Sequence, residues 1–324
     1  MTLQIGILGA GHMGATHARI LSTDRRVRVA AVADVDDERA ERLAREVRAT
    51  PCRTVEDLLG LAIDVLYLTT PNTQHTGAAL TALRANVHVF SEKPMATSLA
   101  EARQIAEAAS VSRGLYQVGH NRRFAPVYRF ARERIGAGFV PYAANVKMNR
   151  GELRNPPWVA DRRVTGGFLY ESTIHLLDMI RWLMGEVVEV WCRAEANVYG
   201  ELDDWSAVLT FASGHSATFS SCAHAAWGYP FERIELYGEH SSIVTEEMDR
   251  VLYTPGLDRE SVINDYSRLA VAERWGYAEE DRLFVDAALR GGPPPVTAED
   301  GLRSVELVDA FYRSAVDRTP VRLA

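Results

Sequence analysis

The chain has 324 residues, of which 47% are apolar and 24% charged, and its net charge is −7. This length predicts two domains, and the composition is typical of a globular protein. The negative charge disfavours a nucleic-acid partner, which normally contacts a basic surface. No apolar run reaches the roughly 20 residues that cross a bilayer. A strand-like run begins at residue 3, so we expect no signal peptide.

The cysteines favour a reduced protein. Cys52, Cys192 and Cys222 are odd in number and far apart, and no C-x-x-C pair occurs. A disulfide framework or a structural zinc site is therefore not expected. The sequence has no H-E-x-x-H or other metal-ligand spacing, so no metal site is predicted. We expect three free thiols in a cytoplasmic protein.

Apolar runs alternate with helical patterns over residues 1–122. Because these runs carry few polar residues, they predict strands buried on both faces of a parallel sheet that is covered by helices. The series is typical of an α/β domain with right-handed crossovers. The predicted strands are 3–8, 27–33, 65–69, 87–91 and 115–119, and the predicted helices are 12–21, 37–47, 72–84 and 99–110.

The pattern changes in residues 123–324. Strand-like stretches now follow one another through short turns, which predicts a mostly antiparallel sheet. The result is an α+β domain that follows the α/β domain. The predicted strands are 142–148, 187–197, 205–211, 216–222 and 231–237, and the predicted helices are 173–183, 278–290 and 298–315.

A glycine-rich stretch follows the first predicted strand. Residues 9–14, "GAGHMG", have G-x-G-x-x-G spacing and lead into a predicted helix. In dinucleotide-binding folds the first glycine allows a tight turn, the second lets the main chain approach a pyrophosphate, and the third allows close packing of helix and strand. The helix N-terminus also favours an anion. Gly9, Gly11 and Gly14 are therefore predicted to bind a dinucleotide, and an ordinary glycine-rich turn is the alternative.

An acidic residue ends the second predicted strand, where dinucleotide-binding folds place the partner of the ribose hydroxyls. Asp34 follows "VAAVA" and is followed by Val35-Asp36-Asp37. A carboxylate accepts hydrogen bonds from a ribose diol and repels a 2′-phosphate, and no arginine directly follows to neutralise that phosphate. The sequence therefore favours NAD over NADP.

The strand at 87–91 ends on Glu92-Lys93-Pro94. Pro94 lacks the N–H that a central strand needs, so the strand stops where the lysine begins. Ligands of open α/β sheets bind beyond the carboxyl ends of the strands. Lys93 is therefore predicted to lie beside the nicotinamide, and a surface lysine in an ordinary loop is the alternative.

A second candidate group lies in "GGFLYESTIHLLD", residues 166–178. Glu171 and His175 are four positions apart, which places them on one face of the predicted helix, and Asp178 follows on a nearby face. A carboxylate that orients a histidine is a common general-base arrangement. A capping glutamate beside a structural histidine is the alternative.

With these motifs the chain resembles the Gfo/Idh/MocA oxidoreductases, the relatives of glucose–fructose oxidoreductase and inositol dehydrogenase. The resemblance spans the chain and rests on "GILGAGHMG", "ADVDDERA", "TTPNTQH", "SEKP", "GHNRRFAP", "GGFLYESTIHLLD" and "DGLRSVELVDAFYRSAVDRTPVRL". It implies an NAD-binding Rossmann domain at 1–122 and a substrate and oligomerisation domain at 123–324, built on a large, mostly antiparallel open sheet. It also implies hydride transfer between nicotinamide and a secondary hydroxyl or ketone of a sugar, cyclitol or sugar derivative.

The resemblance also implies roles for individual residues. Lys93 would hold the reacting hydroxyl, His175 would take its proton, and Glu171 stands where the family usually has Asp. The implied cofactor-binding residues are Gly9, Gly11, His12, Met13, Gly14, Asp34, Thr70, Pro71, Asn72, His75, Glu92 and Lys93. The implied substrate-binding residues are Asn121, Arg122, Trp158, Trp227 and Tyr229.

Two other functions remain open from the sequence. One is a glycosidase or lyase that uses tightly bound NAD for transient oxidation. The other is a non-catalytic NAD-binding regulator, because a Rossmann fold alone does not prove catalysis. Lys93 and His175 argue against the regulator, which would need neither. The expected partners are a small sugar or cyclitol and further copies of the chain through the C-terminal sheet, with no nucleic acid or membrane.

Overall fold

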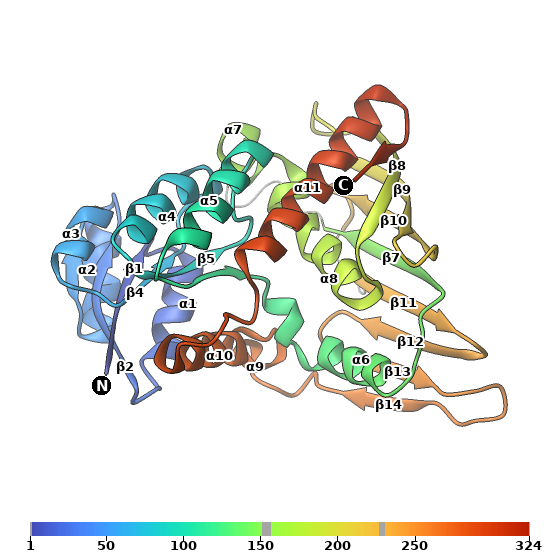
Figure 1. The fold of residues 1–324 in the computed structure, drawn as a ribbon, viewed down its shortest axis with the longest axis horizontal. Helices are drawn as coiled ribbons and strands as arrows, with labels where there is room; N and C mark the ends of the chain where they lie inside the picture. Colours follow the sequence, from blue (N-terminus) through green and yellow to red (C-terminus); the bar gives the residue numbers. More distant parts are fainter. Residues whose placement is uncertain (1, 151–156, 227–230, 324) are drawn as a thin grey trace. The chain divides into compact units, whose positions relative to one another are not determined.

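A computed structural model describes residues 2–150, 157–226 and 231–323. The chain folds into two compact units (Figure 1). The first unit contains Met1–His120 and Tyr277–Val305, and the second contains Asn121–Gly276 and Glu306–Ala324. The three cysteines are free thiols. Among the described residues, no helix has the length and apolar character needed to cross a membrane.

The first unit is built on a parallel sheet of six strands in the order β3-β2-β1-β4-β5-β6. The order reverses at β1, as in doubly wound dinucleotide-binding folds. The strands are β1 Leu3–Leu8, β2 Val27–Ala33, β3 Thr50–Cys52, β4 Val65–Leu68, β5 His88–Glu92 and β6 Tyr116–Gly119. The helices are α1 His12–Leu21, α2 Asp37–Val47, α3 Val55–Gly60, η1 Asn72–Gln74, α4 His75–Arg84, α5 Leu99–Val111 and α10 Tyr277–Arg290.

Helix α10 belongs to this unit although it is far along the chain. It packs against α1, and its Phe284 and Val285 are buried in the same core as Ile5 and Ile7 of β1. Phe284 also contacts the rings of Tyr67 and Phe90, which stack on each other in β4 and β5. A single division near residue 122 does not describe this return, because the apolar face of α10 is buried on the first sheet.

The second unit is built on a sheet of nine strands in the order β14-β13-β12-β11-β7-β10-β9-β8-β15. The pair β7 and β10 is parallel, and the other neighbours are antiparallel. The strands are β7 Ala143–Asn149, β8 Val187–Glu195, β9 Asp204–Phe211, β10 Ser216–Cys222, β11 Glu232–Gly238, β12 Ser241–Glu246, β13 Arg250–Thr254, β14 Val262–Asp265 and β15 Val321–Arg322.

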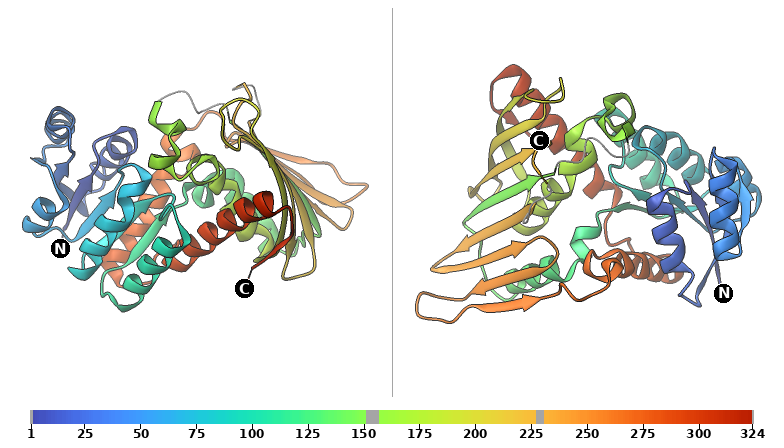
Figure 2. Two further views of the ribbon diagram at one scale, coloured as in Figure 1. Left: turned by 90° about the horizontal axis from the view of Figure 1, so that it is seen from above. Right: turned by 180° about the vertical axis from the view of Figure 1, so that it is seen from behind.

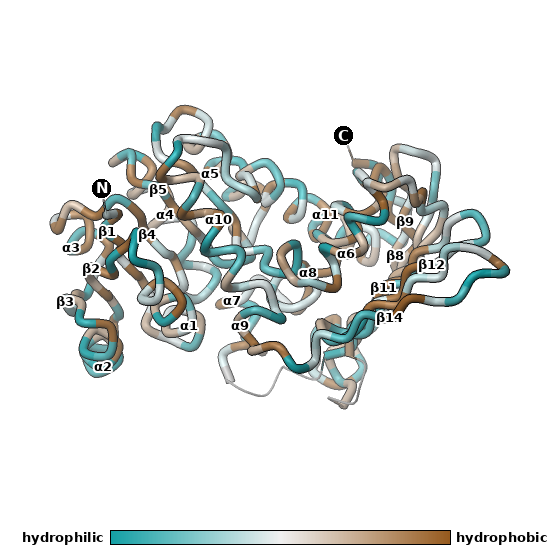
Figure 3. Tube along the Cα trace, turned by 90° about the horizontal axis from the view of Figure 1, so that it is seen from below, coloured by the Kyte–Doolittle hydropathy of each residue, from teal (hydrophilic) through white to brown (hydrophobic). Residues whose placement is uncertain are grey.

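Helices cover one face of this sheet (Figure 2). Phe311 and Tyr312 of the last helix contact Phe219 of β10 and Trp205 of β9, and the opposite face exposes Trp191 and other side chains. Figure 3 shows hydrophobic segments along β1, β4 and β5 of the first sheet, whereas the strands of the second sheet carry both hydrophobic and hydrophilic segments. The remaining helices are η2 Asn121–Phe124, α6 Pro126–Gly136, η3 Pro157–Ala160, α7 Arg162–Thr165, η4 Leu169–Thr173, α8 Ile174–Met184, α9 Val271–Arg274 and α11 Ala298–Asp317.

Candidate active site

The glycine-rich loop between β1 and α1 has the geometry that a pyrophosphate requires. Gly9 has a φ of +104°, and an added Cβ would lie 2.6 Å from the carbonyl oxygen of Thr69. A Cβ on Gly14 would lie 1.9 Å from the Gly9 oxygen, so α1 packs directly against the turn. A Cβ on Gly11 would meet open space. The open main chain at Gly11, at the start of α1, fits a bound anion. His12 and Met13 form the first turn of this helix.

Asp34 lies beyond the end of β2 and connects it to the glycine-rich loop. Its Oδ2 accepts a hydrogen bond from Ala10 N at 2.7 Å, and its Oδ1 accepts one from Asp36 N at 2.9 Å. Each carboxylate oxygen has a second lone pair, so the group can still accept from a ribose hydroxyl. Asp34 therefore holds the loop and fits the expected cofactor contact at the same time.

The loop after β4 carries further predicted cofactor residues. Thr70 Oγ1 is buried and has no hydrogen-bond partner within the described part of the chain, and Pro71 precedes the buried Asn72 at the start of η1. His75 is fully buried, with Nε2 2.9 Å from the Thr70 oxygen and Nδ1 2.7 Å from the Pro94 oxygen. Burial lowers the pKa of His75 below its usual range. This ring links the Thr70 loop to the segment that carries Lys93.

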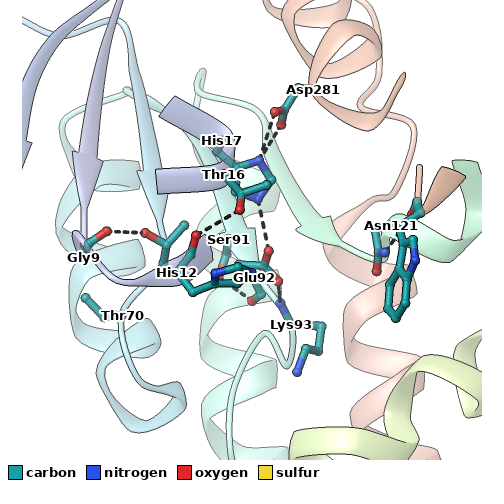
Figure 4. Close-up of polar contacts among 12 residues, drawn as sticks. Gly9, His12, Thr16, His17, Thr70, Ser91, Glu92, Lys93, Asn121 and Asp281 are labelled. Atoms are coloured by element: carbon teal, nitrogen blue, oxygen red, sulfur yellow. Dashed lines mark hydrogen bonds and ion pairs between the residues drawn. The ribbon is translucent and has the colours of Figure 1, made fainter. Parts of the chain in front are cut away.

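Lys93 follows the last residue of β5 and is held at its main chain. Its N–H donates to Glu92 Oε2 at 3.1 Å, while Glu92 Oε1 lies 3.1 Å from Nε2 of His17 (Figure 4). The next residue is fixed by the contact of Pro94 O with His75, and the Lys93–Pro94 peptide bond is cis. The half-buried side chain of Lys93 points away from His17 (Figure 4). Hydrogen bonds at Lys93 N and at Pro94 O thus hold the main chain from which the lysine extends, as a positioned catalytic group requires.

The segment with Glu171 and His175 differs from the predicted regular helix. Residues Leu169–Thr173 form a π-helical turn, and α8 begins only at Ile174. Gly166 and Gly167 precede it with φ values of 84° and 120°. A Cβ on Gly167 would lie 2.4 Å from the hydroxyl of Tyr312, so a larger residue would require the Tyr312 side chain to shift. Such π turns are frequent at functional sites.

This π turn changes the spacing on which the prediction relied. It has more residues per turn than an α-helix, so Glu171 and His175 are not simply one α-helical turn apart. His175 is 7% exposed and Glu171 is half-buried. Asp178 accepts two hydrogen bonds of 2.7 Å from the guanidinium of Arg123, which makes it part of a buried ion pair.

The predicted substrate residues of η2 have partners inside the second unit. The side-chain amide of Asn121 donates to the oxygen of Trp275 at 2.8 Å. Arg122 is 1% exposed and pairs with the carboxylate of Glu232, with its Nη2 2.8 Å from Oε2. Its guanidinium also lies 5.4 Å from the ring centre of Trp275. These contacts give Arg122 a structural role, and its predicted contact with substrate stays a prediction.

The aromatic residues predicted to contact substrate are described unequally. Trp158 lies in η3 and is 40% exposed, which leaves its ring accessible. Trp227 and Tyr229 fall outside the described residues. Lys93 and the cofactor loops thus belong to the first unit, and His175, Asn121 and Trp158 to the second.

Two residues beside Lys93 were missed in the sequence analysis. His17 of α1 and Asp281 of α10 are buried. His17 contacts both Asp281 and Glu92, the residue before Lys93. A signal for His17 exists, because it shares the buried stripe of α1 with Gly14, Ala18 and Leu21. A histidine on such a stripe is usually structural, and 264 positions separate it from Asp281.

Comparison with known protein families identifies the family to which this chain belongs. Residues 3–120 match the oxidoreductase family with an NAD-binding Rossmann fold, and residues 133–323 match the C-terminal alpha/beta domain of the same Gfo/Idh/MocA family. The chain belongs to this family. The predicted resemblance, fold class and NAD cofactor are therefore confirmed, and this Gfo/Idh/MocA protein is an NAD-binding oxidoreductase.

Individual relatives narrow the comparison. The chain is 30% identical to inositol 2-dehydrogenase of Rhizobium meliloti, over 100% of both chains. It is 27% identical to myo-inositol 2-dehydrogenase of Thermotoga maritima, over 99% of this chain and 98% of that one. A solved structure of levoglucosan dehydrogenase with NADH has a TM-score of 0.91 over 100% of both chains, at 20% identity, and supports the fold alone.

Proposed function

We propose that this Gfo/Idh/MocA protein transfers hydride between NAD and a secondary hydroxyl of a cyclitol or sugar, with inositols as the first class to test. Full-length similarity to two inositol dehydrogenases supports this class. The observation that carries the proposal is Lys93, held beyond the end of β5 in the unit that contains the nucleotide loop.

The chain's own residues have complementary roles in this reaction. NAD, when bound, supplies the hydride acceptor. The ammonium of Lys93 donates a hydrogen bond to the reacting oxygen and stabilises the negative charge that develops there. His175 accepts the hydroxyl proton, a contribution of about 10²–10⁴-fold for a positioned base. Gly11 and the α1 N-terminus would hold the pyrophosphate, and Asn121 and Trp158 are proposed to contact the substrate.

An absorbance assay at the NADH wavelength, run over inositols, other cyclitols, sugars and sugar acids, tests the proposal. Steady NADH production with at least one of them is the expected result. Turnover without net NADH would favour the glycosidase or lyase, in which the hydride returns to the product. NAD binding without turnover on any compound would favour the regulator.

The cofactor preference should depend on Asp34. We expect a higher kcat/KM with NAD than with NADP, because the carboxylate repels a 2′-phosphate. Asp34→Asn should narrow this gap. It should also weaken NAD binding, because the side-chain amide cannot accept hydrogen bonds from both Ala10 N and Asp36 N. Initial rates with both cofactors measure the effect. A wild-type preference for NADP would contradict the assigned ribose contact.

Glu171 should act through its charge. The dipole of α8 opposes protonation of His175 near the start of this helix, and the negative charge of Glu171 would favour it. Glu171→Gln should therefore lower kcat and shift the basic limb of its pH profile, whereas Glu171→Asp should keep much of the rate. A rise in KM alone for Glu171→Gln would indicate a substrate contact instead. Wild-type behaviour of both variants would remove Glu171 from the mechanism.

We also propose that copies of the chain associate through the open face of the nine-stranded sheet and that the protein is cytoplasmic. Trp191 and Val208, 53% and 43% exposed, support the first proposal because they leave apolar area on that face. Three free thiols are consistent with a reducing compartment. Sedimentation of the wild type against Trp191→Lys tests the association.

A further inference from the structure

A chain of three buried polar groups lies beneath the Lys93 segment. Nδ1 of His17 is 2.9 and 3.0 Å from the two carboxylate oxygens of Asp281, and Nε2 is 3.1 Å from Glu92 Oε1. His17, Asp281 and Glu92 are 0%, 1% and 7% exposed. They come from α1, α10 and β5, so three separate elements of the first unit meet at one imidazole (Figure 4).

The arrangement favours a protonated His17. Burial alone would lower the pKa of His17, but the carboxylates of Asp281 and Glu92 together raise it well above its ordinary value. An imidazolium donates at both nitrogens, and a carboxylate faces each one. The titratable groups that face this ring are Asp281 and Tyr277 from α10, Glu92 from β5 and Tyr67 from β4.

Both oxygens of Glu92 have partners, and this connects His17 to the lysine. Oε1 contacts His17, while Oε2 accepts the hydrogen bond from Lys93 N. Rotation of the Glu92 carboxylate would break both bonds together. Asp281 therefore orients the ring of His17, His17 orients the carboxylate of Glu92, and Glu92 holds the main chain of Lys93.

We propose that His17 and Asp281 are positioning residues for Lys93, which they hold in place through the carboxylate of Glu92. The proposal rests on the catalytic role of Lys93 in the proposed function. A buried ionic group is a poor source of stability, because packed apolar side chains of similar volume are often as stable. The hydrogen bond that the Lys93 amide donates to Glu92, and the contact of each imidazole nitrogen of His17 with a carboxylate, indicate positioning instead.

The small number of lysines allows the main-chain hydrogen bond of Lys93 to be measured directly. The chain has only two lysines, Lys93 and Lys147. Labelling with ¹⁵N-lysine therefore gives two main-chain amide signals, one at the site and one in β7 of the second unit. The exchange rate of the Lys93 amide reports its bond to Glu92, and Lys147 serves as an internal reference. This measurement needs neither substrate nor turnover.

Two variants of Asp281 separate hydrogen bonding from packing. Asp281→Leu fills the space of the carboxylate with apolar atoms but offers His17 no hydrogen-bond acceptor, whereas Asp281→Asn keeps an acceptor. In Asp281→Leu the Lys93 amide should exchange about tenfold faster, the factor that one ordinary hydrogen bond supplies, with Lys147 unchanged. Asp281→Asn should stay near wild type. Phe284→Leu, a packing change on the same helix, should leave both amides unchanged.

Kinetics provide the second readout, on the substrate found by the screen. Asp281→Leu should lower kcat by up to about 10²-fold, the cost of a small misplacement at the reacting centre, with KM and NAD affinity retained. Asp281→Asn should recover most of this rate. If Asp281→Leu fails to fold, His17→Gln takes its place, with the same expected rise in Lys93 exchange and fall in kcat.

The outcomes are distinct. Wild-type exchange at Lys93 and wild-type kcat in a folded Asp281→Leu or His17→Gln would overturn the positioning role. A parallel loss of NAD affinity would also overturn it, because it would indicate collapse of the cofactor loops. Full activity of Lys93→Ala would refute the catalytic role of Lys93, whereas the exchange result would still report whether the three groups hold its main chain.

Discussion

Lys93→Ala should lower kcat by about 10³-fold, the upper range for removal of one group that stabilises a developing oxyanion. The lysine main chain is fixed by Glu92 and by the neighbouring contact of His75 with Pro94, so the substitution should leave these loops in place. NAD affinity should therefore stay near the wild-type value. Stopped-flow or steady-state rates and NAD titration of the same preparation measure the two effects.

Arginine should not replace this lysine. A planar guanidinium is wider than an ammonium and offers its donors in a fixed fork, so it cannot occupy the same point beside the alkoxide. Lys93→Arg should be nearly as slow as Lys93→Ala. The control is Lys147→Ala, the substitution of the only other lysine, in β7 of the second unit. Wild-type turnover in Lys93→Ala would reduce Lys93 to a loop residue.

The lysine count strengthens this expectation. The chain uses arginine for nearly all of its basic side chains, since only two of its 36 Lys and Arg residues are lysines. A surface position that needed only positive charge could carry arginine equally well. One of the two lysines nevertheless lies at the end of β5, where a compact ammonium is chemically distinct from a guanidinium.

Local sequence patterns predicted much of the first unit. The ranges of β1 and α1 agree with the prediction, because a mostly apolar run and a glycine-flanked amphipathic stretch each have one simple interpretation. The role of each glycine in the loop also followed from its spacing. The strand, the helix and the glycine turn are each determined by residues that are close in sequence, so a local pattern is enough to predict them.

Features that depend on distant contacts were not predictable in the same way. The strands β12 to β14 are short and partly polar, and they are fixed by pairing along the sheet rather than by alternation of their own. The π turn at Leu169–Thr173 follows Gly167, whose close approach to Tyr312 of α11 no local sequence pattern displays. His17 and Asp281 carry no joint pattern, because their partnership arises only when α10 returns to the first sheet.

Arg122 has a structural role that its position in the sequence did not indicate, while its predicted substrate contact stays untested. Its place after the last strand of the first unit suggested a substrate contact, but its guanidinium forms several hydrogen bonds to Glu232, and Tyr128 donates to the same carboxylate at 2.8 Å. Glu232 is 0% exposed. A residue that neutralises a fully buried carboxylate is needed by the fold whether or not substrate is present.

Arg122→Met should therefore destabilise the second unit by about 3–5 kcal/mol, the cost of leaving a buried charge without its partner. Urea unfolding followed by tryptophan fluorescence measures this, because every tryptophan that the structure describes lies in the second unit. Arg122→Lys should recover only part of the loss, since an ammonium cannot reproduce the paired bonds of the guanidinium.

A surface pair supplies the matched control. Arg193 pairs with Glu195 at 3.0 Å on β8, and the two side chains are 69% and 58% exposed. Arg193→Met should cost less than about 1 kcal/mol, because water already solvates both charges. The contrast isolates burial, since both variants remove one arginine from one carboxylate. If Arg122→Met instead unfolds at the wild-type urea concentration and only raises the KM for substrate, then Glu232 does not need this partner and Arg122 is a substrate residue after all.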